Sequence, residues 1–157
     1  MTDEFEDEIH EIDALNLLGV IYIRLGKYEQ AVDLYHKIVG LLTEVDYPSK
    51  VADVVNNIAI AHSQLGQHER AIELLQFALN MDFFEEHQGA RSRVLSNIGV
   101  EYAAFGAYEQ ALDYYRQSLA IRVEIGDRSG ESVVLNHIGA AYQALGHYEQ
   151  ALVNYQD

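Results

Sequence analysis

Hydrophobic residues recur along this chain at the spacing of an α-helix. Leu15, Leu18, Tyr22 and Leu25 follow one another at intervals of three or four residues, so they share one helical face. A second stripe with the same spacing runs through residues 28–38. Together the two stripes predict a pair of helices that pack through their apolar faces, which is a helical hairpin.

A glycine separates the two stripes and recurs every forty residues, at Gly26, Gly66, Gly106 and Gly146. Glycine readily adopts the left-handed conformation that ends many helices, so each is expected to close the first helix of a hairpin. One hairpin cannot bury both of its faces, and the hairpins are therefore expected to stack into a curved solenoid. The predicted repeats span approximately residues 12–47, 52–87, 92–127 and 132–157, the last of them truncated.

Small and large residues also alternate with the repeat. The small residues Gly19, Ala59, Gly99 and Gly139 are expected to let the first helix approach the alanines of the second helix closely. Large side chains are expected to fill the space between neighbouring hairpins. They are Tyr22, Tyr35, Tyr102, Tyr115, Tyr142 and Tyr155.

The phrase Leu-x-x-Leu-Gly-x-x-Tyr followed by Gly-x-Tyr-x-x-Ala-x-x-x-Tyr resembles the tetratricopeptide repeat, and the resemblance covers residues 13–157. It implies one all-α domain over residues 1–157, a right-handed α-solenoid of stacked antiparallel helical hairpins. The chain departs from the family in its forty-residue unit, where 34 is usual. It also lacks the proline that closes the family motif, since Pro48 is its only proline.

Lengthened repeats of this kind are similar to those of kinesin light chains, spindle-orientation adaptors and bacterial regulatory proteins. The extra residues are expected to extend the second helix and the loop after it, as in residues 120–127. The resemblance implies a module that binds other polypeptides in a concave groove lined by the first helices. In the related adaptor families, asparagines at the matching places hold the backbone of the ligand.

Asparagine carries both donors and acceptors, so a row of asparagines is suited to an extended peptide backbone. The alternative is that these asparagines bond carbonyl groups of loops or neighbouring helices. Two arginines of the same face either grip ligand carboxylates or stay solvated. The predicted peptide-binding residues are Asn16, Arg24, Asn56, Asn57, Arg93, Asn97, Asn136, His137 and Gln143.

The formal net charge of −15 disfavours binding to nucleic acid or to an anionic membrane. Four acidic residues, Glu29, Glu69, Glu109 and Glu149, stand in the first turn of each second helix. A carboxylate there offsets the helix dipole, so the charge does not require a basic ligand. The acidic N-terminus does not resemble a secretory signal, and the absence of cysteine fits a cytoplasmic location.

Motifs for catalysis or cofactor binding are missing from the sequence. The seven histidines lie at no metal-binding spacing, and the chain has no phosphate-binding glycine loop, nucleophile elbow or calcium loop. Residues 126–130 are expected to form a turn in which Asp127 or Ser129 caps the next helix. We therefore expect no enzymatic activity, no cofactor and no metal.

Both ends of the chain carry apolar residues that need a covering element. The fourth hairpin stops early, which is expected to expose Tyr148, Leu152 and Tyr155 and to cause self-association or indicate a larger parent protein. At the other end, a helix capped by Thr2 is expected to carry Phe5, Ile9 and Ile12 into the first hairpin. Two alternatives to a free-standing peptide-binding module stay open. They are a regulatory part of a larger bacterial signalling enzyme, such as a cyclase or protease, and a self-assembling scaffold.

Overall fold

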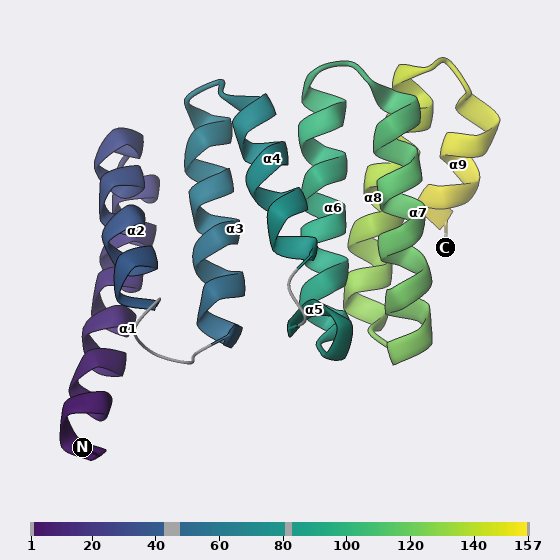
Figure 1. The fold of residues 1–157 in the computed structure, drawn as a ribbon. Coiled ribbons are helices and arrows are strands. Elements are labelled where there is room, and N and C mark those ends of the chain that lie inside the picture. The colour runs from purple at the N-terminus through teal and green to yellow at the C-terminus, as the bar shows by residue number, and fades with distance from the viewer. Residues whose placement is uncertain (1, 43–47, 81–82, 157) are drawn as a thin grey trace. The chain divides into compact units, whose positions relative to one another are not determined.

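The computed structural model describes residues 2–42, 48–80 and 83–156, and within these ranges all regular structure is helical (Figure 1). The all-α class that the sequence predicted is confirmed. None of the described helices has the length and apolar character needed to cross a membrane. The helices are α1 (Thr2–Arg24), α2 (Tyr28–Leu42), α3 (Pro48–Gln64), α4 (His68–Leu79), α5 (Phe83–Glu86), α6 (Gln88–Ala104), α7 (Tyr108–Ile125), α8 (Arg128–Ala144) and α9 (Tyr148–Gln156).

These helices form two compact units, Met1–Leu74 and Leu75–Asp157, which we call unit 1 and unit 2. In unit 1, α2 packs against both α1 and α3. In unit 2, α6, α7, α8 and α9 pack each against the next in chain order (Figure 1). Within each unit the helices are therefore stacked as the hairpin pattern predicted.

The glycine at the end of each first helix takes the left-handed conformation. The φ angles of Gly26, Gly66, Gly106 and Gly146 are 70°, 72°, 77° and 77°. The residue after each glycine donates its backbone N–H to a carbonyl five residues earlier, as Lys27 does to Tyr22 at 2.9 Å. This bond satisfies a carbonyl that the helix end would leave unpaired. The predicted helix ends are confirmed.

The extra residues of the forty-residue unit lengthen α7, which ends at Gly126 with a φ of 72°. Asp127 caps α8 by accepting a hydrogen bond from the Gly130 backbone N–H at 2.9 Å. That bond, together with the ion pair to Arg122, holds the pKa of the Asp127 carboxyl below its ordinary value. The predicted capping turn is confirmed, with Asp127 as the cap.

In the second repeat the extra residues take another course, because α4 ends at Leu79 and the short helix α5 follows. The side chain of Phe84 in α5 is fully buried. In the first repeat, α2 ends at Leu42 and α3 begins at Pro48. Proline suits this first helical position because its missing N–H would have no partner there in any case.

Three glycines of the first helices lie against tyrosine rings of the second helices. A Cβ atom added to Gly19 would lie 2.5 Å from the ring of Tyr35 in unit 1. In unit 2, Gly99 faces Tyr115 in the same way, at 2.5 Å, and Gly139 faces Tyr155 at 2.6 Å. The sequence pattern had predicted alanines opposite these glycines, and tyrosines between neighbouring hairpins. The structure shows instead that each glycine makes room for a ring of its own hairpin.

Each unit has an apolar core that the predicted helical stripes supply. Ile12 and Ile38 are fully buried in the core of unit 1, and Ile9 is half-buried. Phe5 was also expected to pack into the first hairpin, but its side chain lies outside the part of the chain that the structure describes. In unit 2, α7 and α8 bury six residues against each other: Ala111, Leu112, Tyr115, Val134, Ile138 and Ala141.

Candidate functional site

Polar side chains join the first helices of successive hairpins at equivalent positions. In unit 1, the Asn57 side-chain amide on α3 donates to Oδ1 of Asn16 on α1 at 3.1 Å. In unit 2, Oγ of Ser96 on α6 and Nδ1 of His137 on α8 lie 3.4 Å apart. Both pairs join residues 41 positions apart. The repeat therefore builds the same kind of polar bridge once in each unit.

The Asn16–Asn57 bridge orients two amides without using all of their hydrogen-bonding groups. Asn16 accepts through its oxygen, and Asn57 uses one N–H. A carboxamide has two N–H donors and an oxygen with two lone pairs, so each residue retains groups that suit another amide. Both side chains are half-buried, which limits their motion. The sequence left open that these asparagines bond carbonyl groups of a neighbouring helix. Asn57 does bond a neighbouring helix, but its acceptor is the Asn16 side chain and not a backbone carbonyl.

Apolar residues line the same helices beside the bridges. In unit 2, Val100 on α6 and Val133 on α8 are 38% and 50% exposed. In unit 1, Ile60 on α3 is 36% exposed and Val20 on α1 is half-buried. Polar groups with fixed orientation and exposed aliphatic groups thus alternate on the first helices, a combination that fits a peptide backbone and its side chains.

His137 is half-buried beside the ring of Tyr115, with 5.2 Å between ring centroids and 37° between ring planes. Burial lowers the pKa of His137 below its ordinary value of 6.5, because the charged imidazolium loses hydration. The imidazole is therefore neutral near pH 7. Whether Nδ1 donates to Ser96 or accepts from it depends on the tautomer.

Acidification is expected to destabilise the fold through His137. Below pH 6.5 the unfolded chain protonates this histidine before the folded chain does, because the folded pKa is lowered. The contribution of His137 to the free energy of unfolding is complete above pH 6.5 and is lost as the pH falls through the folded pKa. Urea unfolding of wild type and His137→Gln between pH 5 and 8 measures this loss.

The variant His10→Gln, at an exposed histidine of α1, serves as the control. The pH dependence should flatten in His137→Gln and persist in His10→Gln. Equal slopes in wild type and His137→Gln would show that His137 does not titrate differently in the two states.

The other predicted residues lie on the first helices and on α9. Asn56 and Asn97 are half-buried and Arg93 is exposed, and each of the three already interacts with another group. Gln143 is exposed on α8 and accepts a hydrogen bond from the Tyr155 hydroxyl at 3.2 Å. The remaining predicted residues are exposed on α1, α8 and α9: Arg24, Asn136, Tyr148, Leu152 and Tyr155.

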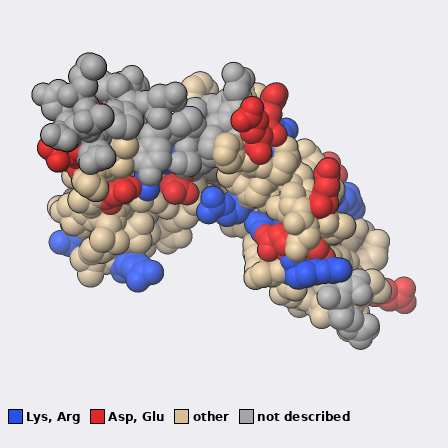
Figure 2. Space-filling model, turned by 90° about the horizontal axis from the view of Figure 1, so that it is seen from below, with Lys and Arg blue, Asp and Glu red and all other residues tan. Residues whose placement is uncertain are grey.

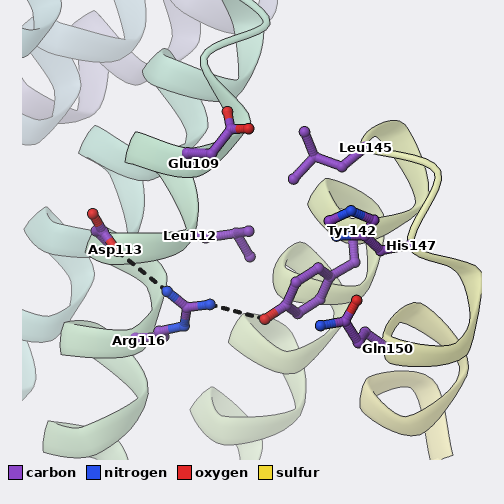
Figure 3. Close-up of a pocket in the computed structure, with 8 residues that line it drawn as sticks. All are labelled: Glu109, Leu112, Asp113, Arg116, Tyr142, Leu145, His147 and Gln150. Carbon is purple, nitrogen blue, oxygen red and sulfur yellow. Dashed lines mark hydrogen bonds and ion pairs between the residues drawn. The ribbon is translucent and has the colours of Figure 1, made fainter.

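A pocket of about 410 Å³ opens between α7, α8 and α9. Arg116 on α7 points toward Tyr142 on α8 (Figure 3) and donates to its hydroxyl at 2.8 Å. The same guanidinium contacts Asp113 at 3.2 Å. This pocket was not predicted from the sequence, because its residues come from α7, from α8, from α9 and from the turn between the last two, and share no motif. Its lining residues are Glu109, Leu112, Asp113, Arg116, Tyr142, Leu145, His147 and Gln150.

The polar groups that line this pocket are the carboxylates of Glu109 and Asp113, the Arg116 guanidinium, the Tyr142 hydroxyl, the His147 imidazole and the Gln150 amide. Arg116 already has two partners, so an incoming carboxylate would compete with Asp113 for it. Within the described ranges, no three histidine and acidic side chains are grouped so that they hold a metal ion.

The described charged side chains do not gather in one patch on the face that Figure 2 draws. On the face drawn in Figure 2, acidic and basic residues are intermingled, with uncharged surface between them. The structure also pairs some opposite charges, such as Lys37 with Glu11 at 3.0 Å and Arg128 with Glu131 at 3.0 Å. The described acidic residues form no single acidic surface on the face drawn in Figure 2.

Comparison with known families and structures gives matches along the whole repeat region. The family described as tetratricopeptide repeat matches residues 10–82, 50–124 and 90–157. No curated protein matches the chain.

Three solved structures illustrate the similarity. BtubC (BKLC) from P. vanneervenii is 25% identical with a TM-score of 0.79, and the match covers 92% of this chain and 60% of that one. A putative kinesin light chain from Podosopora anserina with nearly identical TPR-like repeats is 21% identical with a TM-score of 0.76, covering 92% and 71%. The Rap conjugation gene regulator of plasmid pLS20, solved with the Phr* peptide, is 17% identical with a TM-score of 0.79. That match covers 99% of this chain and 44% of the regulator, so the chain spans less than half of that protein.

Proposed function

The chain belongs to the tetratricopeptide repeat family, and on that premise we propose that it binds polypeptide segments through the exposed face of its first helices. The observation that carries this proposal is the polar bridge that recurs between first helices, Asn16 with Asn57 in unit 1 and Ser96 with His137 in unit 2. The proposed role is binding, without catalysis.

The bridges are suited to a peptide backbone because their groups are oriented before a ligand arrives. An amide held by one hydrogen bond loses little further side-chain entropy when it forms a second bond, which favours affinity. At neutral pH the bridge of unit 2 has no charged member, since burial lowers the pKa of His137. A neutral peptide backbone therefore fits these groups better than a carboxylate or phosphate does.

The apolar residues beside the bridges supply the second part of the binding surface. Val100 and Val133 offer aliphatic area to ligand side chains. Burying such area contributes about 25 cal/mol for each Å². We infer that the preferred ligand has small or aliphatic side chains next to the backbone segment that is bound. The Phr* peptide bound to the Rap conjugation gene regulator, which shares the fold, supports a peptide as the class of ligand.

Peptide selection on the purified chain, followed by affinity measurements on variants, tests the proposal. Peptides selected from a random display library are synthesised, and their binding is followed by fluorescence anisotropy. Asn57→Ala or His137→Ala removes a bridge residue from the unit that binds. We expect the variant to bind about tenfold or more weakly, since the other residue of the bridge loses its hydrogen bond.

Two exposed glutamines at equivalent positions of the second helices provide matched controls, Gln30→Ala in unit 1 and Gln110→Ala in unit 2. These variants should bind the selected peptide as wild type does. Circular dichroism confirms that every variant is folded. Unchanged affinity in both bridge variants, or a loss in the glutamine variants instead, would overturn the assignment of the first helices.

A further inference from the structure

Helix α9 exposes the face that corresponds, one repeat later, to the face of α7 that packs against α8. Leu152 and Tyr155 on α9 are 57% and 45% exposed. Their equivalents forty residues earlier, Leu112 and Tyr115 on α7, are each only 3% exposed. Leu112 is buried in a core that α8 completes. Tyr148, at the start of α9, is exposed as well. The end of unit 2 therefore presents the binding face for a helix that resembles α8.

Helix α1 exposes the face that corresponds, by repeat position, to the face of α8 that packs against α7. Ile138 and Ala141 of α8 are each 3% exposed. Their equivalents on α1, Leu18 and Ile21, are 37% and 43% exposed. Leu25, directly after α1, is 62% exposed, whereas its equivalent Leu145, directly after α8, is partly buried against the core of unit 2. Unit 1 therefore begins with a helix whose apolar face has the pattern of α8 but lies in the solvent.

The sequence of α1 makes this face more apolar than in the other first helices. Leu17 is 63% exposed and occupies the position that holds Asn57, Asn97 and His137 in the later repeats. In those repeats a polar residue stands where α1 has a leucine. Leu17 and Leu18 thus expose two large apolar side chains on α1, and exposed apolar surface of this kind can mark a protein contact.

We propose that α9 of one copy of this chain packs against α1 of a second copy, repeating between two molecules the packing of α8 on α7. The contact uses different faces on the two copies, so it is head-to-tail and produces rings or open chains. At its edge, Arg24 of α1 corresponds to Gln64, which accepts a hydrogen bond from the Tyr28 hydroxyl at 3.3 Å. The Tyr148 hydroxyl, equivalent to that of Tyr28, meets the Arg24 guanidinium in the same place and accepts from it.

Sedimentation velocity over a wide concentration range tests the proposal with two single variants. Leu152→Glu blocks the α9 face and keeps α1, while Ile21→Glu blocks the α1 face and keeps α9. Each variant alone is expected to associate at least about tenfold more weakly than wild type, because a charge enters the contact. An equimolar mixture should form a dimer and no larger species, because each copy supplies the one intact face that the other needs.

The control is Val123→Glu, at an aliphatic residue of α7 that is 58% exposed and belongs to neither face. It should associate as wild type does. A wild type that stays monomeric at every concentration would overturn the proposal. So would association by Ile21→Glu alone, which would indicate contact between two α9 helices. Dimer formation in the mixture also shows that both variants are folded.

Discussion

Replacing Gly99 with alanine is expected to lower the free energy of unfolding by about 2 to 3 kcal/mol. The added Cβ atom would lie 2.5 Å from the ring of Tyr115, which is closer than two carbon atoms can approach. Tyr115 is only 3% exposed, so its ring has little room to move aside. Urea unfolding followed by circular dichroism measures the loss.

A compensating substitution makes this test specific for the contact. The second repeat carries Ala59 and Leu75 where the third carries Gly99 and Tyr115. Tyr115→Leu alone is expected to destabilise the chain by leaving a cavity. The double variant Gly99→Ala/Tyr115→Leu should lose less than the sum of the two single losses, by about 1 to 2 kcal/mol. Strict additivity would show that the glycine is not needed for the ring.

The equivalent glycine of the last hairpin provides the control. A Cβ atom at Gly139 would lie 2.6 Å from the ring of Tyr155, nearly as close as at Gly99. Tyr155 is 45% exposed, however, so its ring can swing toward solvent. Gly139→Ala is therefore expected to destabilise the chain clearly less than Gly99→Ala. Equal losses would indicate that helix contacts other than the ring decide the effect.

Raising the pH through 10 to 12 is expected to destabilise the fold through Tyr35 and Tyr115. Burial raises the pKa of each hydroxyl from 10.0 to about 12, and the charge of Glu101 adds to the effect at Tyr115. The Asn57 side chain lies close enough to oppose the shift at Tyr35. The Asn57 amide and the Tyr35 hydroxyl do not meet the geometry of a hydrogen bond, since the Tyr35 hydroxyl has no hydrogen-bond partner among the described residues.

The sign of the change in the free energy of unfolding depends on whether the folded or the unfolded chain keeps the phenol protons to higher pH. The folded chain keeps both phenols neutral after the unfolded chain has begun to ionise, so their contribution is complete below pH 10 and is lost as the pH rises through 12. At about 1.4 kcal/mol for each pKa unit, the loss is at most about 3 kcal/mol for each tyrosine.

Phenylalanine variants isolate this loss from the other groups that titrate at alkaline pH. The free energy of unfolding should depend less steeply on pH in Tyr35→Phe and in Tyr115→Phe than in wild type. Tyr148→Phe, at a tyrosine that is 69% exposed, should keep the wild-type slope. Absorbance of the phenolate, followed in parallel, should show a late ionisation that loses one tyrosine in each of Tyr35→Phe and Tyr115→Phe. If all tyrosines of the folded chain ionise together, burial does not control these two.

The positions of the helix ends were predictable because their causes are local. A glycine at Gly26 or Gly106 takes a positive φ more readily than other residues, whatever surrounds it. Asp127 caps α8 through a backbone N–H only three residues away. Apolar residues three and four apart share one helical face by the geometry of the helix alone. The repeat length, the hairpins and the all-helical class follow from such short-range relations.

The partners of the functional side chains were not predictable in the same way. The sequence placed Asn16 and Asn57 on first helices, but their mutual bond joins residues 41 positions apart. The pocket around Arg116 and Tyr142 depends on how three helices meet, and no spacing in the sequence encodes it.

By itself the sequence determined the forty-residue period, the helical hairpins and their left-handed glycine turns, because hydrophobic spacing and backbone preference act within a few residues. Only the tertiary structure decided that Tyr35 and Tyr115 rest on Gly19 and Gly99, and that Asn57 bonds Asn16. These contacts depend on the distance and angle between packed helices. A shift of one ångström in that packing would change which atoms meet while the hydrophobic pattern stayed the same.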